Sequence, residues 1–259
     1  MNIEVLYHYT SLENLALILN TRKIRFNSLE NVDDKLEGET EDVGKIGKHL
    51  FVSCWTHTSA EDISLWSLYT NNMTGIRVRM KANPFKQISY KKGEFALYED
   101  TNCFIDLDVL KRDNKSTYAN INESYFEVKY TNDRDLLRPK CYNKESGIID
   151  LSDCGDYKKL IWAFQQEVRY AFFLFPFTND DYFSYKNNKS KDNPLDKFIN
   201  NSTLKSYEHY DVELADDALD DIEVVTGPRM SEGDFILVDA LMKQYCKNYT
   251  LKRSELPIR

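Results

Sequence analysis

The chain has 259 residues, of which 42% are hydrophobic and 29% are charged, so it can bury a sizeable core. Its formal net charge of −8 weighs against a general nucleic-acid-binding surface, because non-specific binding depends on clustered lysine and arginine. The 17 tyrosines and 14 phenylalanines weigh against low-complexity disorder. Composition therefore predicts a folded globular chain.

The cysteines and the apolar stretches bear on the compartment. Five cysteines, an odd number without a Cys-x-x-Cys pair, argue against a zinc ribbon and against a disulfide framework. No signal pattern opens the chain, and no stretch approaches the roughly 18 apolar residues of a membrane span. We therefore expect reduced thiols, a cytoplasmic location and no membrane partner.

The first 80 residues have the pattern of a compact α/β unit. Strands are predicted where apolar residues alternate or run together, at 4–9, 23–26, 50–55 and 76–80. Helices are predicted over 12–20, with Ser11 as the N-cap, and over 60–69. Between them, residues 27–39 have the composition of an acidic loop.

The rest of the chain mixes weak and strong patterns. Strands are expected at 125–130, 167–175 and 222–226, with a last edge strand at 254–259. Helices are expected over 157–164, with Leu160, Ile161 and Phe164 inward, and over 232–245; residues 136–149 could be loop or weak helix. The polar segment 178–201 has the composition of an exposed insertion. Because no repeat or linker divides the chain, we expect one mixed α+β domain over residues 1–259.

His8 and Thr10 are the first candidate functional residues. A strand places residues two apart on the same face, so the two side chains point together. An imidazole and a hydroxyl on one face can hold a sugar diol by hydrogen bonds. The competing interpretation is a buried histidine that is paired with a backbone carbonyl.

Ser53, Trp66 and Tyr69 form a second group. Trp66 and Tyr69 are three residues apart on the predicted helix, and aromatic faces stack well on a flat heterocycle such as nicotinamide or adenine. Ser53 lies in the apolar strand that precedes this helix. The alternative is that the aromatic helix face fills the core.

Glu167 and Arg169 share one face of a predicted strand. A nearby guanidinium favours the ionised carboxylate, and a fixed carboxylate stabilises the oxocarbenium ion that forms when a glycosidic bond breaks. The alternative is a structural ion pair near the surface.

Asp33, Asp34, Glu37 and Glu39 form an acidic cluster that suggests either a metal site or a solvated loop. The spacing matches no calcium loop, and no histidine or cysteine joins it. The loop is therefore favoured, and no metal is expected.

Several short blocks of the chain together resemble a known family. They lie at 6–11, 24–27 with Asp34, Glu37 and Gly38, 52–55, 65–69 with Gly75, 162–169, 225–231 and 254–259. The order is similar to a widespread bacterial family, domain-of-unknown-function family two-nine-seven-one, over nearly the whole chain. That family's late signature is Trp-x-x-Glu-x-Glu-x-Arg, and this chain has Gln165 at the first glutamate and Glu167 at the second.

A more distant resemblance suggests an activity. The block Tyr7-His8-Tyr9-Thr10 is similar to the Tyr-His-Gly-Thr block of diphtheria-toxin-type ADP-ribosyltransferases, with Tyr9 in place of glycine. This resemblance implies their split-sheet fold and NAD as the substrate. It also implies that His8 would bind the adenosine ribose, Tyr69 would stack on nicotinamide and Glu167 would hold the nicotinamide-ribose hydroxyl.

The leading hypothesis is therefore an ADP-ribosyltransferase-like enzyme that moves ADP-ribose from NAD to a macromolecular acceptor or to water. Bacterial defence or toxin biology is the setting that the resemblance suggests. The catalytic candidate is Glu167, and the candidates for NAD binding are His8, Thr10, Ser53, Trp66, Tyr69 and Arg169.

Two alternatives belong to other classes of function. Tyr9 and Gln165, which depart from the two motifs, would suit a non-catalytic nucleotide-binding or regulatory module on the same fold. Asp33, Asp34 and Glu37 would be the ligands of a metal-dependent nuclease.

Overall fold

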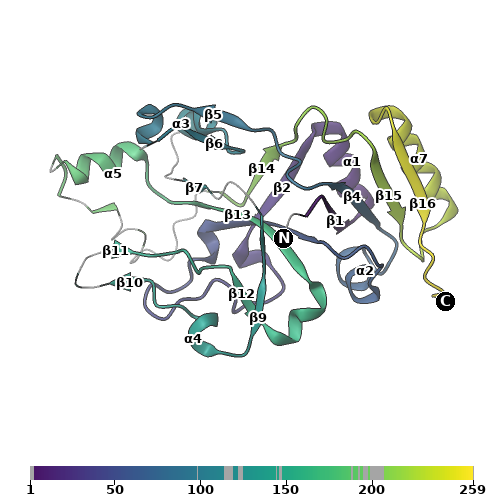
Figure 1. Cartoon of the computed structure of the whole chain (residues 1–259), viewed down its shortest axis with the longest axis horizontal. Coiled ribbons are helices and arrows are strands. Elements are labelled where there is room, and N and C mark those ends of the chain that lie inside the picture. Colours follow the sequence, from purple (N-terminus) through teal and green to yellow (C-terminus); the bar gives the residue numbers. More distant parts are fainter. Residues whose placement is uncertain are drawn as a thin grey trace.

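The computed structural model describes residues 3–97, 99–113, 119–121, 125–143, 145, 148–187, 189–191, 193, 194, 198 and 207–258. Within these ranges a ten-stranded sheet runs through the centre of the molecule (Figure 1). Its strands are β1 (Val5–Thr10), β2 (Lys23–Ser28), β3 (Leu50–Thr56), β4 (Ile76–Lys81), β7 (Ala119–Ile121), β8 (Phe126–Glu127), β13 (Glu167–Leu174), β14 (His209–Glu213), β15 (Ile222–Thr226) and β16 (Tyr249–Arg253).

The main path of the sheet is β14-β2-β3-β1-β4-β15-β16, and β13 branches from it by pairing with β3. Strands β15 and β16 are parallel, whereas the other pairs on the path are antiparallel, so the sheet is mixed. The combination of helices with this sheet agrees with the mixed α/β character predicted from the sequence. Three small two-stranded sheets lie beside it: β5 (Ile88–Tyr90) with β6 (Thr101–Cys103), β9 (Lys129–Thr131) with β12 (Tyr157–Lys159), and β10 (Tyr142–Asn143) with β11 (Ile148–Ile149).

The helices cover the sheet and its connections. The α-helices are α1 (Leu12–Thr21), α2 (Ile63–Tyr69), α3 (Leu107–Asp113), α4 (Arg134–Leu137), α5 (Asn179–Lys186) and α7 (Glu232–Tyr245). The 3-10 turns are η1 (Leu29–Asn31), η2 (Gly47–His49), η3 (Glu94–Ala96) and η4 (Leu160–Gln165). In the part of the chain that is described, no helix has the length and apolar character needed to cross a membrane.

The two edges of strand β3 are paired differently, and this difference leaves a gap in the sheet. Along one edge it pairs with β13 from Leu50 to Thr56. Along the other edge, β2 pairs only at Phe51 and Val52, and β1 pairs only at Thr56. Among the described strands, the stretch from Ser53 to Trp55 therefore has no partner on this edge. We call this divergence of β1 and β2 the fork.

Helix α1 joins the two arms of the fork. It begins at a sound N-cap, because Ser11 accepts a hydrogen bond from the Asn14 amide, and it ends where Arg22 takes a left-handed conformation (φ 54°). Its buried face, Leu15, Ile18 and Leu19, packs into the main core, and its outer side lies beside α7 (Figure 1). The short connection fixes how far β2 can diverge from β1.

Most of the strands predicted from the sequence are confirmed to within a few residues. These are the strands expected at 4–9, 23–26, 50–55, 76–80, 167–175 and 222–226, together with the helices expected over 12–20 and 232–245. The helix expected over 60–69 begins only at Ile63, because the Asp62 carboxylate accepts hydrogen bonds from the amides of Ser64 and Leu65 and caps it there.

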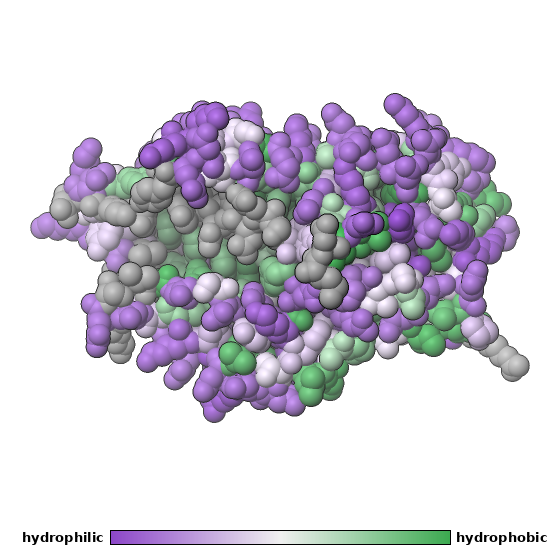
Figure 2. All heavy atoms as spheres, viewed as in Figure 1, coloured by the Kyte–Doolittle hydropathy of each residue, from purple (hydrophilic) through white to green (hydrophobic). Residues whose placement is uncertain are grey.

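The helix expected over 157–164 is wrong. Residues 157–159 form β12 by pairing with β9, and only then does the 3-10 turn η4 follow. Leu160 and Ile161 do not face inward, because they are 52% and 77% exposed. Figure 2 shows hydrophobic side chains gathered along the lower edge of this face, where η4 and α2 lie.

Three other expectations need correction. The strand expected at 125–130 is divided into β8 and β9, and the weak region 136–149 contains the hairpin β10–β11. The last strand is β16, not 254–259, of which the structure describes all but Arg259. The polar segment 178–201 opens with helix α5, and Phe198 is buried, so the part of this segment that is described is not a wholly exposed insertion.

We expect Gly75→Ala to lower the free energy of unfolding by about 1–3 kcal/mol, as overpacking does. A Cβ at this position would lie 2.3 Å from the carbonyl oxygen of Thr10, in β1, and 2.7 Å from the Cβ of Thr70. The matched control is Gly233→Ala in α7, where a Cβ meets nothing closer than 3.8 Å. Urea unfolding should show a stability equal to or above wild type for that control. Equal stabilities of the two variants would contradict the close approach.

We also expect stability to fall as pH drops from about 6.5 toward about 4 because of His49. Its side chain is only 1% exposed and lies against Phe198, and burial, with the Lys48 charge, lowers the pKa of His49 to about 4. The unfolded chain therefore binds this proton first, and the loss approaches about 3 kcal/mol. His49→Gln should flatten the slope in urea titrations across this range. An unchanged slope in His49→Gln would contradict this role of His49.

Candidate functional site

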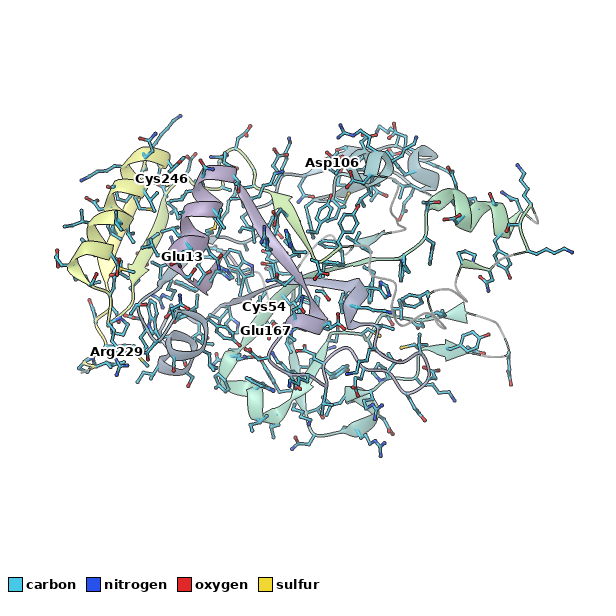
Figure 3. The ribbon with its side chains drawn as sticks, turned by 180° about the vertical axis from the view of Figure 1, so that it is seen from behind. Glu13, Cys54, Asp106, Glu167, Arg229 and Cys246 are labelled. Atoms are coloured by element: carbon cyan, nitrogen blue, oxygen red, sulfur yellow. The ribbon has the colours of Figure 1, made fainter. Side chains whose placement is uncertain are left out.

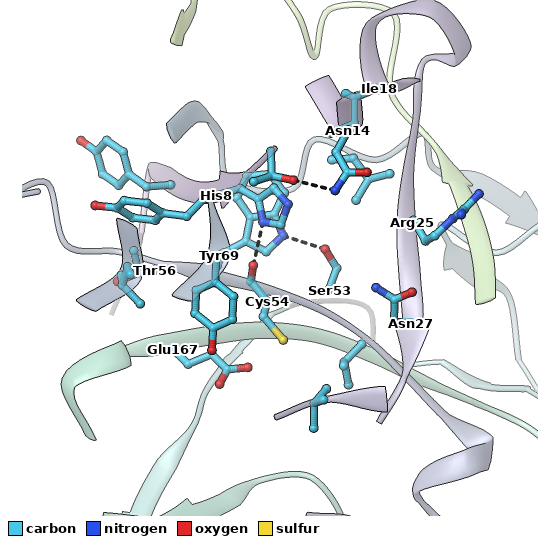
Figure 4. A pocket seen from close by; sticks show the side chains of 18 of the residues that line it. His8, Asn14, Ile18, Arg25, Asn27, Ser53, Cys54, Thr56, Tyr69 and Glu167 are labelled. Atoms are coloured by element: carbon cyan, nitrogen blue, oxygen red, sulfur yellow. Dashed lines mark hydrogen bonds between the residues drawn. The ribbon is translucent and has the colours of Figure 1, made fainter. Parts of the chain in front are cut away.

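A cavity of about 600 Å³ opens at the fork (Figure 4). A volume of this size is in the range of small-molecule and cofactor sites. Its walls come from β1, α1, β2 and β3, and its far side is formed by Tyr69, Lys158, Gln165 and Glu167. The cavity thus exists because two strands diverge, and side chains from three separate parts of the chain, within 7–69, within 158–167 and at Asp211, line it.

His8 closes the gap in backbone pairing at the fork. Its Nδ1 donates a hydrogen bond to the Cys54 carbonyl oxygen at 2.9 Å, in the stretch of β3 whose edge toward β1 and β2 has no partner among the described strands (Figure 4). The bond fixes the tautomer, so Nε2 is the acceptor of the ring. Burial lowers the pKa of His8, which keeps the imidazole neutral at pH 7. His8 therefore both satisfies a backbone carbonyl of β3 and lines the cavity.

Two hydroxyls and an amide surround His8. Asn14 Nδ2 donates to Thr10 Oγ1 at 3.0 Å, and Trp55 Nε1 donates to Ser53 Oγ at 3.0 Å. Each hydroxyl therefore accepts one bond and retains its own O–H as a donor. All four side chains line the cavity, so the wall around His8 carries both hydrogen-bond donors and acceptors.

Four buried charges form an ion cluster beneath the other half of the cavity: Glu37, Lys158, Glu167 and Arg169. Arg169 Nε lies 2.7 Å from Glu167 Oε1, and Arg169 Nη1 lies 2.5 Å from Glu37 Oε1. Lys158 Nζ lies 3.1 Å from Glu167 Oε2 and 3.5 Å from Glu37 Oε2. With two cations and two carboxylates, the cluster is neutral, as burial requires.

The ion cluster holds Glu167 in its charged form. Burial alone would raise the pKa of Glu167, but Arg169 and Lys158 outweigh it and lower the pKa to about 2. Cys54 lies beside Glu167 at the centre of the molecule (Figure 3), and burial, together with that carboxylate, raises the pKa of the Cys54 thiol. At neutral pH the pair is therefore a carboxylate beside a protonated thiol.

Gln165 connects the ion cluster to Tyr69. Lys158 has only hydrogen-bond donors, so Gln165 must present Oε1 to it, at 2.8 Å. Its Nε2 then donates to the Tyr69 hydroxyl oxygen at 2.5 Å. Burial, and the adjacent Asp33 carboxylate, raise the pKa of Tyr69, so its hydroxyl stays protonated. The Tyr69 ring is thereby held at one wall of the cavity.

The structure brings five of the seven residues predicted from the sequence to this cavity: His8, Thr10, Ser53, Tyr69 and Glu167. Trp66 and Arg169 are placed elsewhere, since both are 0% exposed. The Trp66 indole packs edge-on against Tyr9 at 5.0 Å and donates to Glu61, so it fills the core and has no face open to a ligand. Arg169 supports Glu167 from within the core.

Sequence reasoning missed several residues of the site. Lys158 lies in a segment predicted as helix, and Asn14 lies in the first turn of the helix predicted over 12–20, without a functional role assigned to it. Gln165 was noted only as a departure from a motif. Asn14 and Gln165 had a local signal, since each is close in sequence to a predicted site residue, whereas Lys158 had none.

The expectation of a solvated acidic loop is wrong for Asp34 and Glu37, which are each 9% exposed. Glu37 is paired with two cations in the ion cluster and so is not poised to bind a metal. Across the part of the chain that is described, no three histidine, cysteine or acidic side chains gather in a way that could hold a metal ion. Asp33 instead lines the cavity beside Tyr69.

No protein-family model matches the chain, and no curated protein matches it either. Two solved structures resemble it, both of DarT from Thermus sp. 2.9, one in complex with carba-NAD+ and the other with NAD+. Each match covers 98% of this chain and 97% of the other, with 11% and 12% identity and a TM-score of 0.31. A likeness this weak assigns neither fold nor activity. The resemblances to family two-nine-seven-one and to ADP-ribosyltransferases therefore stay predictions.

We expect Glu37→Gln to cost about 3–5 kcal/mol of unfolding free energy, because it leaves two buried cations with one carboxylate. The matched control is Glu39→Gln, two residues away. Its partners Lys45 and Arg138 are 68% and 42% exposed at the side chain, so the loss should stay below about 1 kcal/mol. Urea unfolding of both variants measures the difference. Equal losses would mean that the ion cluster is not a buried unit.

Proposed function

We propose that the chain binds NAD in the cavity at the fork and cleaves the bond between nicotinamide and ribose. ADP-ribose would then pass to a macromolecular acceptor or to water. The observation that carries this proposal is the convergence of His8, Tyr69 and Glu167, from three distant parts of the chain, around one cavity of about 600 Å³. Each offers a different chemistry to the same ligand.

The half of the cavity around His8 suits a ribose. A ribose diol consists of two hydroxyls that donate and accept, and His8 Nε2 is a fixed acceptor in a neutral ring. Thr10 and Ser53 add hydroxyl donors on the same wall. His8, Thr10 and Ser53 thus match a sugar through hydrogen bonds from uncharged groups.

The half around Tyr69 suits the nicotinamide ring. The Tyr69 ring is held through its hydroxyl by Gln165 and Asp33, so it offers a rigid aromatic face at little entropic cost. Tyr9, which stands where the transferase block has glycine, is turned toward Trp66, and its hydroxyl accepts from the Asp62 amide at 3.2 Å. Tyr9 is part of the lining of the cavity, but its ring packs against Trp66 in the core.

Glu167 would act as an electrostatic group. When the glycosidic bond breaks, its electron pair leaves with nicotinamide, which becomes neutral, and C1′ of the ribose develops positive charge. An ionised carboxylate fixed beside C1′ stabilises that charge. A nucleophile then attacks C1′ and loses its proton. A pKa of about 2 keeps Glu167 ionised throughout.

The alternative of a non-catalytic nucleotide-binding module rests on the same ion cluster. Both oxygens of Glu167 already face a cation, at 2.7 Å and 3.1 Å, so the field that it projects into the cavity is reduced. Gln165 supplies no second carboxylate. This module would bind NAD without releasing nicotinamide.

We expect Glu167→Gln to reduce nicotinamide release from NAD by about 100- to 1,000-fold, as the loss of one transition-state contact does. NAD binding, measured by calorimetry, should change much less, because the ribose and ring contacts remain. Circular dichroism and urea unfolding establish the folded fraction of each variant.

Glu39→Gln is the matched control, since Glu39 belongs neither to the ion cluster nor to the lining of the cavity. It should retain nicotinamide release in proportion to its folded fraction. Release by Glu167→Gln at the wild-type rate would exclude the catalytic role. Binding without release by wild type would favour the module, and the absence of NAD binding would overturn both proposals.

A further inference from the structure

Cys141 and Cys154 form a close pair outside the cavity. Their Sγ atoms lie 3.4 Å apart, and the two residues are 3% and 7% exposed. Both belong to the hydrophobic cluster that also contains Leu50 and Phe173. A sulfur–sulfur bond measures about 2.05 Å, so a shift of little more than 1 Å would join them.

The backbone holds both cysteines in place. The Asp42 carboxylate accepts from the amides of Cys141 and Tyr142 at 2.9 Å and 2.8 Å, and the Cys141 carbonyl accepts from Asp150 at 2.8 Å. Cys154 donates its amide to the Leu151 carbonyl at 3.0 Å, within the turn that leads to β12. The thiols are therefore neighbours because two anchored turns meet.

The pair is chemically asymmetric. The hydrogen bond with Cys154 lowers the pKa of Cys141, and the same bond, with burial, raises the pKa of Cys154. We therefore assign Cys141 as the attacking thiol. Cys141 directly precedes the β10–β11 hairpin, whose strands have only two residues each, so local opening that admits a small reagent is inexpensive.

We propose that Cys141 and Cys154 are an oxidation site, at which a small disulfide such as oxidised glutathione forms an intramolecular disulfide. The Cys141 thiolate attacks one sulfur of glutathione disulfide and expels the first glutathione thiolate, which gives a mixed disulfide. Cys154, after losing its proton, attacks Cys141 Sγ and expels the second. One protein disulfide forms, two glutathione thiols are produced, and the protein loses two hydrogen atoms.

This bond would tie the hairpin to the segment that supports the ion cluster. Gly155 follows Cys154 directly, and its carbonyl accepts from Arg169 Nη1 at 2.9 Å. Lys158, three residues further, is a member of the ion cluster. Oxidation would therefore limit the motion of this segment. The inference depends on no step of the proposed NAD chemistry.

The test is incubation of the whole folded chain with oxidised and reduced glutathione at a series of ratios, followed by intact-mass and peptide mass spectrometry. We expect the loss of two hydrogen atoms, located to a cross-link between the peptides containing Cys141 and Cys154. The melting temperature should rise by about 5–10 °C, because a short loop is closed. Hydrogen exchange of residues 148–158 should slow in the oxidised form.

Cys141→Ala and Cys154→Ala should each abolish the cross-link and the rise in melting temperature. The control is Cys246→Ala, because Cys246 is a buried cysteine at the C-cap of α7. This control should keep both the cross-link and the rise in melting temperature. Because the main measurement uses wild type, poor folding of a variant does not decide the outcome. A wild-type chain that stays fully reduced, or that stops at a mixed disulfide, in the most oxidising mixture would overturn the proposal. A cross-link between other cysteines would overturn it as well.

Discussion

Charge balance in the ion cluster is the constraint on which the rest of the molecule depends. Glu37 comes from the connection after β2, Lys158 from β12, and Glu167 and Arg169 from β13, so one neutral unit joins segments far apart in the sequence. None of the four can be exposed or removed alone, because a single uncompensated charge in this interior costs several kcal/mol. These segments can therefore fold only together.

The fork follows from the same arrangement. Strand β13 carries two members of the ion cluster and pairs with β3 along its whole length, which leaves the opposite edge of β3 to be shared by β1 and β2. Where they diverge, an exposed carbonyl would lack a partner, and His8 supplies one at Cys54. Cys54 then connects the two halves of the cavity, since its carbonyl faces His8 and its thiol faces Glu167.

Local pattern was enough to predict much of the fold and part of the site. Alternation located β1, β2 and β4, and the capping residue Ser11 located the start of α1, because these signals lie within a few residues of one another. The convergence of His8, Tyr69 and Glu167 was expected only through a resemblance, since no local rule links residues so distant. Five of the seven predicted residues reach the cavity.

What the sequence did not predict depends on long-range pairing. In the sequence, Glu37 and Lys158 have no neighbour that distinguishes them from solvated surface residues. Only the fold brings Arg169 and Glu167 to them as buried partners. Trp66 has the spacing of a stacking platform, yet it fills the core, because packing against Tyr9 satisfies an indole as well as a ligand does. The residues 157–159 pair with β9, and this tertiary contact overrides their helical pattern.

The ion cluster also restricts the chemistry that Glu167 can perform. A carboxylate with a pKa of about 2 carries no proton at neutral pH, so Glu167 cannot be a general acid, and it is too weak a base to remove a proton from a hydroxyl nucleophile efficiently. What remains is electrostatic stabilisation of a nearby cation. Loss of nicotinamide demands nothing more, because this leaving group departs neutral and unprotonated while the positive charge moves to the ribose. The two cations that weaken the field of Glu167 are therefore also the reason that its charge is constant, and the reaction proposed for the cavity is one that needs a constant charge.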